Sequence, residues 1–203
     1  MLRDVSPRIG LVLLAAGGSS RLGTPKQLLV FQGRTLLRRA AEEALASGCH
    51  PVVIVLGAYA DRLTREIVDL PVLVAHNVAW RTGMGGSIRT GIEALTEAGH
   101  AVDGVVIAVC DQPFCDASVI HRLLEGHARG EQRIVTASYA GGYGVPVLFD
   151  ATLVPELLAL DGPEGARRVI ESHRDSILSV SFDAGAVDID TPEDLTRLEG
   201  TRA

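Results

Sequence analysis

The sequence predicts a single-domain α/β protein, a three-layer α/β/α sandwich around a mostly parallel, Rossmann-like sheet. Short apolar runs alternate with amphipathic stretches along the whole chain, as repeated strand–helix–strand units require. The runs IGLVLLA at 9–15 and GVVIAV at 104–109 show no polar alternation, so helices should cover both faces of these strands. The chain has 203 residues and no internal repeat or linker, which suits one sizeable core.

Each apolar run is a candidate strand, and each stretch with helical spacing is a candidate helix. The expected strands cover residues 9–15, 51–56, 72–75, 105–109, 134–138, 145–149 and 187–189. The expected helices cover residues 35–46, 60–68, 87–98, 117–128, 153–160, 165–172 and 192–198. The segment YAGGY at 139–143 is expected to leave the sheet.

Composition and charge argue against several classes of function and location. The formal net charge is −6 and the basic residues are scattered, which argues against a nucleic-acid surface but allows a small anionic ligand. The N-terminus lacks the apolar centre of a signal peptide, and no apolar run approaches the ~20 residues of a membrane span. We therefore expect a cytoplasmic protein without membrane or nucleic-acid partners, whose three cysteines stay reduced.

Ligands of open parallel sheets bind beyond the carboxyl ends of the strands. The first such loop is LLAAGGSSRLGTPKQLL at 13–29, whose only charges are Arg21 and Lys26. It fits neither a Walker A loop, because Thr24-Pro25 replace the Lys-Ser/Thr pair, nor a GxGxxG fingerprint. Its backbone N–H groups can still converge on phosphate oxygens, and its two cations can neutralise a polyphosphate. A flexible loop with solvated charges is the alternative.

Two aspartates in later loops are candidate metal ligands. In VVIAVCDQPF, Asp111 follows a buried strand, where its carboxylate suits Mg²⁺; a simple turn is the alternative. In VDIDTPEDL, Asp188 and Asp190 would point to the same side of a strand, and Thr191 with Pro192 predicts a helix start. Asp190 is therefore a candidate second ligand, and two carboxylates with two cations would suit a metal–triphosphate site.

A second glycine-rich segment is HNVAWRTGMGGSIRTGI at 76–92. Gly83, Gly85 and Gly86 precede Ser87, which we expect to cap the helix that follows. Glycine backbone would also let a flat base approach and be read by main-chain hydrogen bonds. A glycine turn into a capped helix, without ligand, is the alternative.

Together these motifs resemble the nucleotidyltransferases of the molybdenum-cofactor and methylerythritol cytidylyltransferase type. The likeness covers nearly the whole chain and is closest to the molybdenum cofactor cytidylyltransferases. The matching segments are AAGGSSRLGTPKQLL at 15–29, the glycine/serine segment 83–87, CDQP at 110–113, GVPVLF at 144–149, DGPEGAR at 161–167 and DIDTPEDL at 188–195.

The resemblance implies a role for each matching residue. Ala15, Ala16 and Gly17 would face the base and ribose, and Gly18, Ser19, Ser20, Arg21 and Lys26 would hold the triphosphate. Gly83, Gly86 and Ser87 would help to read the base, and Asp111 and Asp190 would hold Mg²⁺. The catalytic groups would be Lys26, Arg21 and Asp111.

The resemblance also implies a reaction, in which CMP passes from CTP to a phosphate-bearing acceptor, molybdopterin above all. The acceptor phosphate would attack the α-phosphate in line and pyrophosphate would leave, so no general base is needed. The nucleotide-binding part would cover about 9–115 and the acceptor-binding part about 116–190. A molybdoenzyme or a chaperone would receive the product.

Two positions depart from the family pattern. Cys110 stands where the family usually has Gly before the first metal-binding Asp, and Val145 stands where it commonly has His. Because that histidine belongs to the acceptor half of the site, the acceptor stays open. The alternatives are GTP as donor, a sugar phosphate as acceptor, or a non-catalytic nucleotide- or pterin-binding protein.

Overall fold

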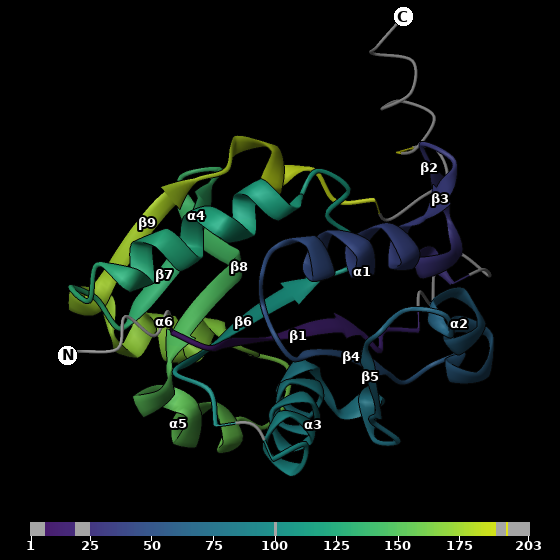
Figure 1. The fold of residues 1–203 in the computed structure, drawn as a ribbon, viewed down its shortest axis with the longest axis horizontal. Helices are drawn as coiled ribbons and strands as arrows, with labels where there is room; N and C mark the ends of the chain where they lie inside the picture. The colour runs from purple at the N-terminus through teal and green to yellow at the C-terminus, as the bar shows by residue number, and fades with distance from the viewer. Residues whose placement is uncertain (1–6, 19–24, 100, 190–193, 195–203) are drawn as a thin grey trace, which may run out of the picture.

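The central sheet has seven strands and is mostly parallel, as the sequence predicts (Figure 1). The computed structural model describes residues 7–18, 25–99, 101–189 and 194. Within the sheet, β8 runs antiparallel to β6 and β7, and the other neighbouring strands are parallel. In spatial order the strands are β5 (Leu73–His76), β4 (Val52–Leu56), β1 (Ile9–Ala15), β6 (Gly104–Val109), β8 (Gly142–Asp150), β7 (Ile134–Tyr139) and β9 (Ile177–Ser181).

Helices cover both faces of this sheet, which confirms the three-layer sandwich (Figure 1). Strand residues alternate between two cores: Leu11 and Leu13 pack with one helix layer, and Val12 and Leu14 pack with the other. This double burial explains why the strands lack polar residues. One layer holds α1 (Leu36–Ala46), α2 (Ala60–Ile67) and α4 (Ala117–Ala128); the other holds α3 (Met84–Glu97), α5 (Val154–Leu158) and α6 (Arg167–Ser172).

The structure corrects two expectations about the sheet. The segment 139–143 does not leave it: Tyr139 pairs with Gly142, and Ala140 and Gly141 form a two-residue turn with positive φ between β7 and β8. Residues 187–189 form no strand, and the last strand among the described residues is β9, which pairs with β7. The expected helix at 192–198 lies outside the described residues except for Asp194, which is helical.

The strand order reverses between β1 and β6. From β1 the chain moves through α1 to β4 on one side, whereas β6 pairs with β1 on its other side. Such a switch point leaves a crevice at the carboxyl ends of the two strands, because their following connections run in opposite directions. The loops after Ala15 and Val109 therefore begin side by side.

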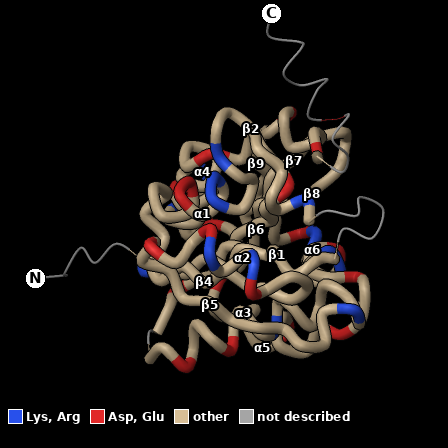
Figure 2. The backbone as a smooth tube through the Cα atoms, turned by 90° about the vertical axis from the view of Figure 1, so that its right-hand side faces the viewer, with Lys and Arg blue, Asp and Glu red and all other residues tan. Residues whose placement is uncertain are grey.

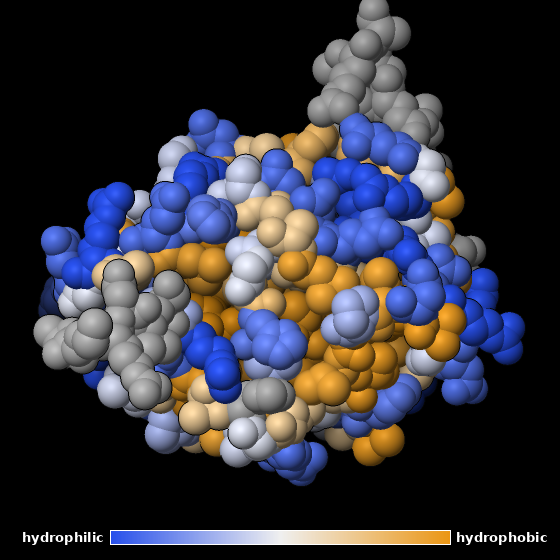
Figure 3. All heavy atoms as spheres, in the orientation of Figure 1, coloured by the Kyte–Doolittle hydropathy of each residue, from blue (hydrophilic) through white to orange (hydrophobic). Residues whose placement is uncertain are grey.

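The surface is mixed in charge and partly apolar. On the face that Figure 2 shows, basic and acidic residues are interspersed along the chain. A small two-stranded ribbon of β2 (Val30–Phe31) and β3 (Arg34–Thr35) lies outside the main sheet. Edge strand β5 leaves Leu73 and Val74 partly exposed, and Figure 3 shows apolar surface on this side of the molecule. None of the described helices is long and apolar enough to cross a membrane.

Candidate active site

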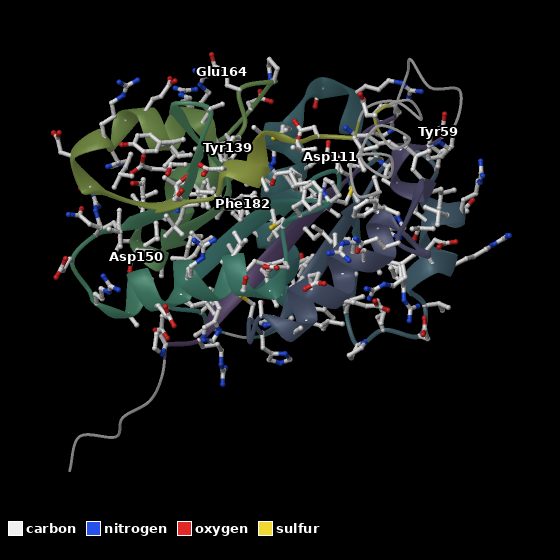
Figure 4. The ribbon with its side chains drawn as sticks, turned by 90° about the horizontal axis from the view of Figure 1, so that it is seen from above. Tyr59, Asp111, Tyr139, Asp150, Glu164 and Phe182 are labelled. Carbon is white, nitrogen blue, oxygen red and sulfur yellow. The ribbon has the colours of Figure 1, made fainter. Side chains whose placement is uncertain are left out.

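A cavity of about 610 Å³ opens at the switch point between β1 and β6. Asp111 follows β6. In the view of Figure 4 it lies between Tyr139 of the β7–β8 hairpin and Tyr59 of the loop after β4. Four chain segments line the cavity: the end of β1, the 3-10 helix Lys26–Leu28, the segment 80–87 and the end of β6. Its lining residues are Leu14, Ala15, Ala16, Gly17, Lys26, Gln27, Trp80, Arg81, Gly83, Met84, Ser87, Val109, Cys110 and Asp111.

Lys26 and Asp111 form an ion pair in this cavity. The two side chains are 21% and 20% exposed, so the pair is shielded from bulk water and still within reach of a ligand. Both residues follow strands whose carboxyl ends are neighbours, which is why positions 85 residues apart meet. Lys26 is the only lysine in the whole sequence.

Gln27 shapes the loop after β1, and the sequence reasoning missed it. Its side chain is buried, and its Nε2 donates hydrogen bonds to the carbonyl oxygens of Ala15 (2.9 Å) and Gly17 (2.7 Å). In a trans peptide unit the C=O and the following N–H point in opposite directions. The N–H of Gly18 is therefore directed away from Gln27. The one signal in the sequence was its place, between Lys26 and the apolar run 28–31.

Trp80, the only tryptophan of the chain, packs against two glycine positions beside the cavity. A Cβ on Gly18 would lie 2.5 Å from the Trp80 ring, and a Cβ on Gly57 would lie 2.7 Å from the Trp80 Cβ. Glycine is thus needed at both positions for this packing. The guanidinium of Arg81 lies over the same ring, 4.4 Å from its centroid. Neither Trp80 nor Arg81 was predicted as a site residue.

The start of α3 differs from the expectation. The helix begins at Met84 after Gly83, so Ser87 lies inside it and is not its N-cap. Instead, Ser87 is buried and its Oγ accepts a hydrogen bond from Asn77 Nδ2 (2.9 Å). Gly83 has φ 132°, and a Cβ there would lie 2.3 Å from the carbonyl oxygen of Gly162. The 161–167 segment therefore packs closely against the start of α3.

The predicted site residues fall into three groups. Ala15, Ala16, Gly17, Lys26, Gly83, Ser87 and Asp111 line the cavity. Gly18 packs beside it against Trp80, and Gly86 is buried in α3 near Asn77. Ser19, Ser20, Arg21 and Asp190 lie outside the described residues.

Among the described residues, no three His, Cys, Asp or Glu side chains form a metal-binding cluster. The protein groups described at the cavity therefore supply only part of the ligands that a divalent cation needs. Asp111 is one carboxylate, which suffices for Mg²⁺ when substrate phosphates supply further oxygens. The N–H of Ile189, which precedes Asp190 in the sequence, donates to the carbonyl oxygen of Asp111 (3.1 Å). That hydrogen bond places Ile189 next to Asp111.

The two departures from the family pattern have structural consequences. Burial, and then the nearby Asp111 carboxylate, raise the pKa of the Cys110 thiol, so this side chain stays protonated and is a poor nucleophile. Val145, in β8, packs against the core on the α3 side of the sheet. A second cavity of about 640 Å³ lies at the β7–β8 hairpin. Its lining contains two arginines, Arg167 and Arg174, and two acidic residues, Glu171 and Asp183, so the formal charges of these residues balance.

A glycine-rich turn and a carboxylate at the switch point of a Rossmann-like sheet are typical of α/β proteins that bind phosphorylated ligands. Residues 11–177 match the model of the MobA-like NTP transferase domain. Because this match covers most of the chain, the protein belongs to the MobA-like NTP transferase family.

Known relatives match nearly the whole chain. It is 35% identical to the nicotine blue oxidoreductase of Paenarthrobacter nicotinovorans, with 95% of this chain and 97% of that protein covered. It is 28% identical to the purine catabolism protein PucB of Bacillus subtilis (strain 168), with 93% and 95% covered. The crystal structure of Rv0371c from Mycobacterium tuberculosis H37Rv has a TM-score of 0.81 at 30% identity, with 96% and 98% covered. A structure of Rv0371C in complex with manganese has a TM-score of 0.76 at 27% identity, with 94% and 97% covered.

Proposed function

We propose that this chain is a Mg²⁺-dependent nucleotidyltransferase that transfers CMP from CTP to a phosphate-bearing acceptor, molybdopterin above all, and releases pyrophosphate. The observation that carries the proposal is the Lys26–Asp111 pair at the switch point. One of these side chains suits a phosphate oxygen and the other suits a metal ion. Family membership supports the reaction class. The donor base and the acceptor rest on the sequence resemblance.

In the proposed reaction, an acceptor phosphate oxygen attacks the α-phosphorus of CTP. A P–O bond to the acceptor forms as the bond to the β-phosphate oxygen breaks, and pyrophosphate leaves with the electron pair. Lys26 would exchange Asp111 for a phosphate oxygen, and Arg21 would add a second positive charge. Mg²⁺, held by Asp111 and Asp190, would supply further neutralisation of the triphosphate charge. The manganese complex of a relative supports a divalent ion in this family.

The other contacts are part of the same proposal. Ala15, Ala16 and Gly17 would approach the nucleoside, and their place in the cavity lining supports this. Residues about 9–115 would bind the nucleotide and about 116–190 the acceptor. The close packing of Gly83 against Gly162 supports one site shared by both parts. A cytoplasmic location and delivery of the product to a molybdoenzyme or chaperone remain predictions.

A labelling experiment tests the nucleotide site without relying on turnover. Because Lys26 is the only lysine, an amine-acylating reagent can modify one side chain besides the α-amino group. We expect CTP with Mg²⁺ to protect Lys26, as read by peptide mass spectrometry, while the α-amino group stays reactive. Equal labelling with and without any nucleoside triphosphate would contradict the proposed site.

Activity is measured as pyrophosphate release with CTP, GTP, ATP or UTP and molybdenum-loaded molybdopterin or a sugar phosphate. Lys26→Ala and Asp111→Asn should each lower kcat/KM about 100-fold or more, because each removes a group that neutralises transition-state charge. Arg89→Ala and Asp175→Asn, two exposed side chains outside the cavity lining, are the matched controls. Release with GTP and none with CTP would overturn the cytidylyl assignment.

The name of one relative supplies a second candidate function. The nicotine blue oxidoreductase is 35% identical over nearly the whole chain, so conversion of nicotine blue is tested with the same preparation. Turnover of nicotine blue, together with no pyrophosphate release from any nucleoside triphosphate, would favour that activity over nucleotidyl transfer.

A further inference from the structure

Arg81 is a second cation in the lining of the cavity, and the proposed reaction does not use it. It lies in the short 3-10 helix Trp80–Thr82 that leads into α3, and its side chain is exposed at the cavity. Lys26, in contrast, is four-fifths buried. The two cations come from separate loops of the carboxyl edge, one after β1 and the other after β5.

Trp80 restrains the position of Arg81. The Trp80 side chain itself packs against two glycine positions: a Cβ on Gly18 would overlap its ring, and a Cβ on Gly57 would overlap its Cβ. The guanidinium lies 4.4 Å from the ring centroid, within the range of a cation–π contact. A long flexible side chain is thus kept over one face of a fixed aromatic ring, and less conformational freedom is lost when it binds a ligand.

The charges of the lining single out Arg81. Lys26 and Asp111 neutralise each other in an ion pair. Among the ion pairs and hydrogen bonds of the described part of the chain, Arg81 has no carboxylate partner. Arg81 therefore gives the described lining its excess positive charge. Such a charge in the lining of a cavity attracts an anion.

We propose that Arg81, stacked on Trp80, binds the triphosphate of the nucleotide as an additional phosphate-binding residue. The inference rests on the proposed nucleotide site. A guanidinium presents a planar fork of N–H donors that matches phosphate oxygens, which a lysine cannot reproduce. The contact would complement Lys26 from a different segment of the cavity lining, 80–87.

Calorimetric titrations of the full chain with Mg²⁺ test this, using CTP, inorganic tripolyphosphate and cytidine as ligands. Arg81→Gln should weaken binding of CTP and tripolyphosphate about 10- to 100-fold, the usual size of a lost charge-assisted hydrogen bond, and leave cytidine unchanged. Arg81→Lys should recover part of the loss, because the charge stays and the fork is missing. Arg89→Gln, an exposed arginine in α3 outside the lining, should bind like the unmodified chain.

Trp80 gives an independent readout, because it is the only tryptophan. Binding of tripolyphosphate should change its fluorescence in the unmodified chain and much less in Arg81→Gln. Equal affinities of Arg81→Gln and the unmodified chain, with binding lost in Lys26→Ala, would overturn this inference and leave the proposed function standing. An equal loss for cytidine would make Arg81 a nucleoside contact and also overturn it. If neither CTP nor tripolyphosphate binds the unmodified chain, both proposals fail.

Discussion

At the scale of single residues, Gln27 and Gly18 make the contacts that position residues 15–18, the start of the first loop. The Gln27 amide draws two carbonyl groups to one side, so that a backbone N–H of the same loop points away from it. Gly18 leaves the space that Trp80 occupies, whereas no atom of the described residues lies within 4 Å of the position that a Cβ on Gly17 would take. The two adjacent glycines thus differ: packing requires glycine at 18, whereas no described neighbour requires it at 17.

Substitution of Gln27 by Leu should reduce both stability and nucleotide affinity. Two carbonyl groups at this position would lose their donor, at a cost of roughly 1–3 kcal/mol for each one left buried without a partner. Urea unfolding and CTP titration measure the two effects. Gln132→Leu, at a partly exposed position, is the control. Unchanged CTP affinity in a folded Gln27→Leu protein would mean that the amide does not position the loop.

The two neighbouring glycines should respond differently to alanine. Gly18→Ala should lower the free energy of unfolding by about 1–3 kcal/mol, because the new methyl group overlaps the Trp80 ring. Gly17→Ala should leave stability within about 0.5 kcal/mol and weaken only nucleotide binding. Thermal unfolding and CTP titration of both variants separate these outcomes. A stable Gly18→Ala protein with unchanged Trp80 fluorescence would contradict the packing argument.

At the scale of elements, Arg38 joins α1 to α2. Its guanidinium donates to both carboxylate oxygens of Asp69 (2.5 and 2.9 Å), to Glu42 Oε1 (2.7 Å) and to the carbonyl oxygen of Glu66 (3.1 Å). These hydrogen bonds from Arg38 lower the pKa of Asp69 and Glu42 below their ordinary values, and Arg34 also contributes at Glu42. The two helices are thus linked by charge as well as by packing.

The Arg38 pairs should contribute to stability above the unfolded-state pKa values of Asp and Glu, roughly 4. Because the folded-state values are lower, the contribution is lost as pH falls through them. Arg38→Gln should therefore lower Tm near neutral pH and show a weaker fall of Tm between about pH 5 and 3. Arg65→Gln, an exposed arginine of α2, is the control. Parallel Tm–pH curves for Arg38→Gln and the unmodified chain would show that the pairs are too solvated to matter.

At the scale of the whole molecule, the sheet topology brings distant segments to one edge. The switch point places the loop after β1 beside Asp111. Gln112 Nε2 then donates to the Tyr139 hydroxyl (3.1 Å) and to the Gly185 carbonyl (3.0 Å), which ties this loop to the β7–β8 hairpin and to the last described segments. Asp111, which lines the cavity, is therefore followed by a residue that is anchored to segments from later in the chain.

Removal of divalent metal should abolish activity and the stabilisation that the nucleotide confers. We expect CTP with Mg²⁺ to raise Tm, because a ligand that binds only the folded state stabilises it. EDTA should remove both effects, and Mn²⁺ should restore them, since both ions accept carboxylate and phosphate oxygens. Pyrophosphate release that persists in EDTA would show that Lys26 and the arginines suffice without a metal ion.

The sequence by itself determined most of the fold. Strand β1 was predicted with its observed bounds, because a strand covered on both faces is a continuous apolar run. Strand β9 was missed, since its residues are only partly buried at the sheet edge and carry a weak pattern. The short apolar segment 187–189 was wrongly read as a strand; Ile189 instead packs with Phe31 and Leu36.

The residues of the candidate site divide in the same way, into those that the sequence indicated and those that only the structure revealed. The sequence determined that Lys26 and Asp111 belong to loops at the carboxyl ends of strands, and the resemblance assigned both to one site. Only the tertiary structure decided that Ser87 bonds Asn77 inside a helix, that Gln27 holds the first loop and that Trp80 fixes Arg81 at the cavity. Strand and helix patterns depend on spacing along the chain, which a sequence displays. Contacts between separate loops depend on which strands pair with each other, and this pairing forms only in the folded sheet.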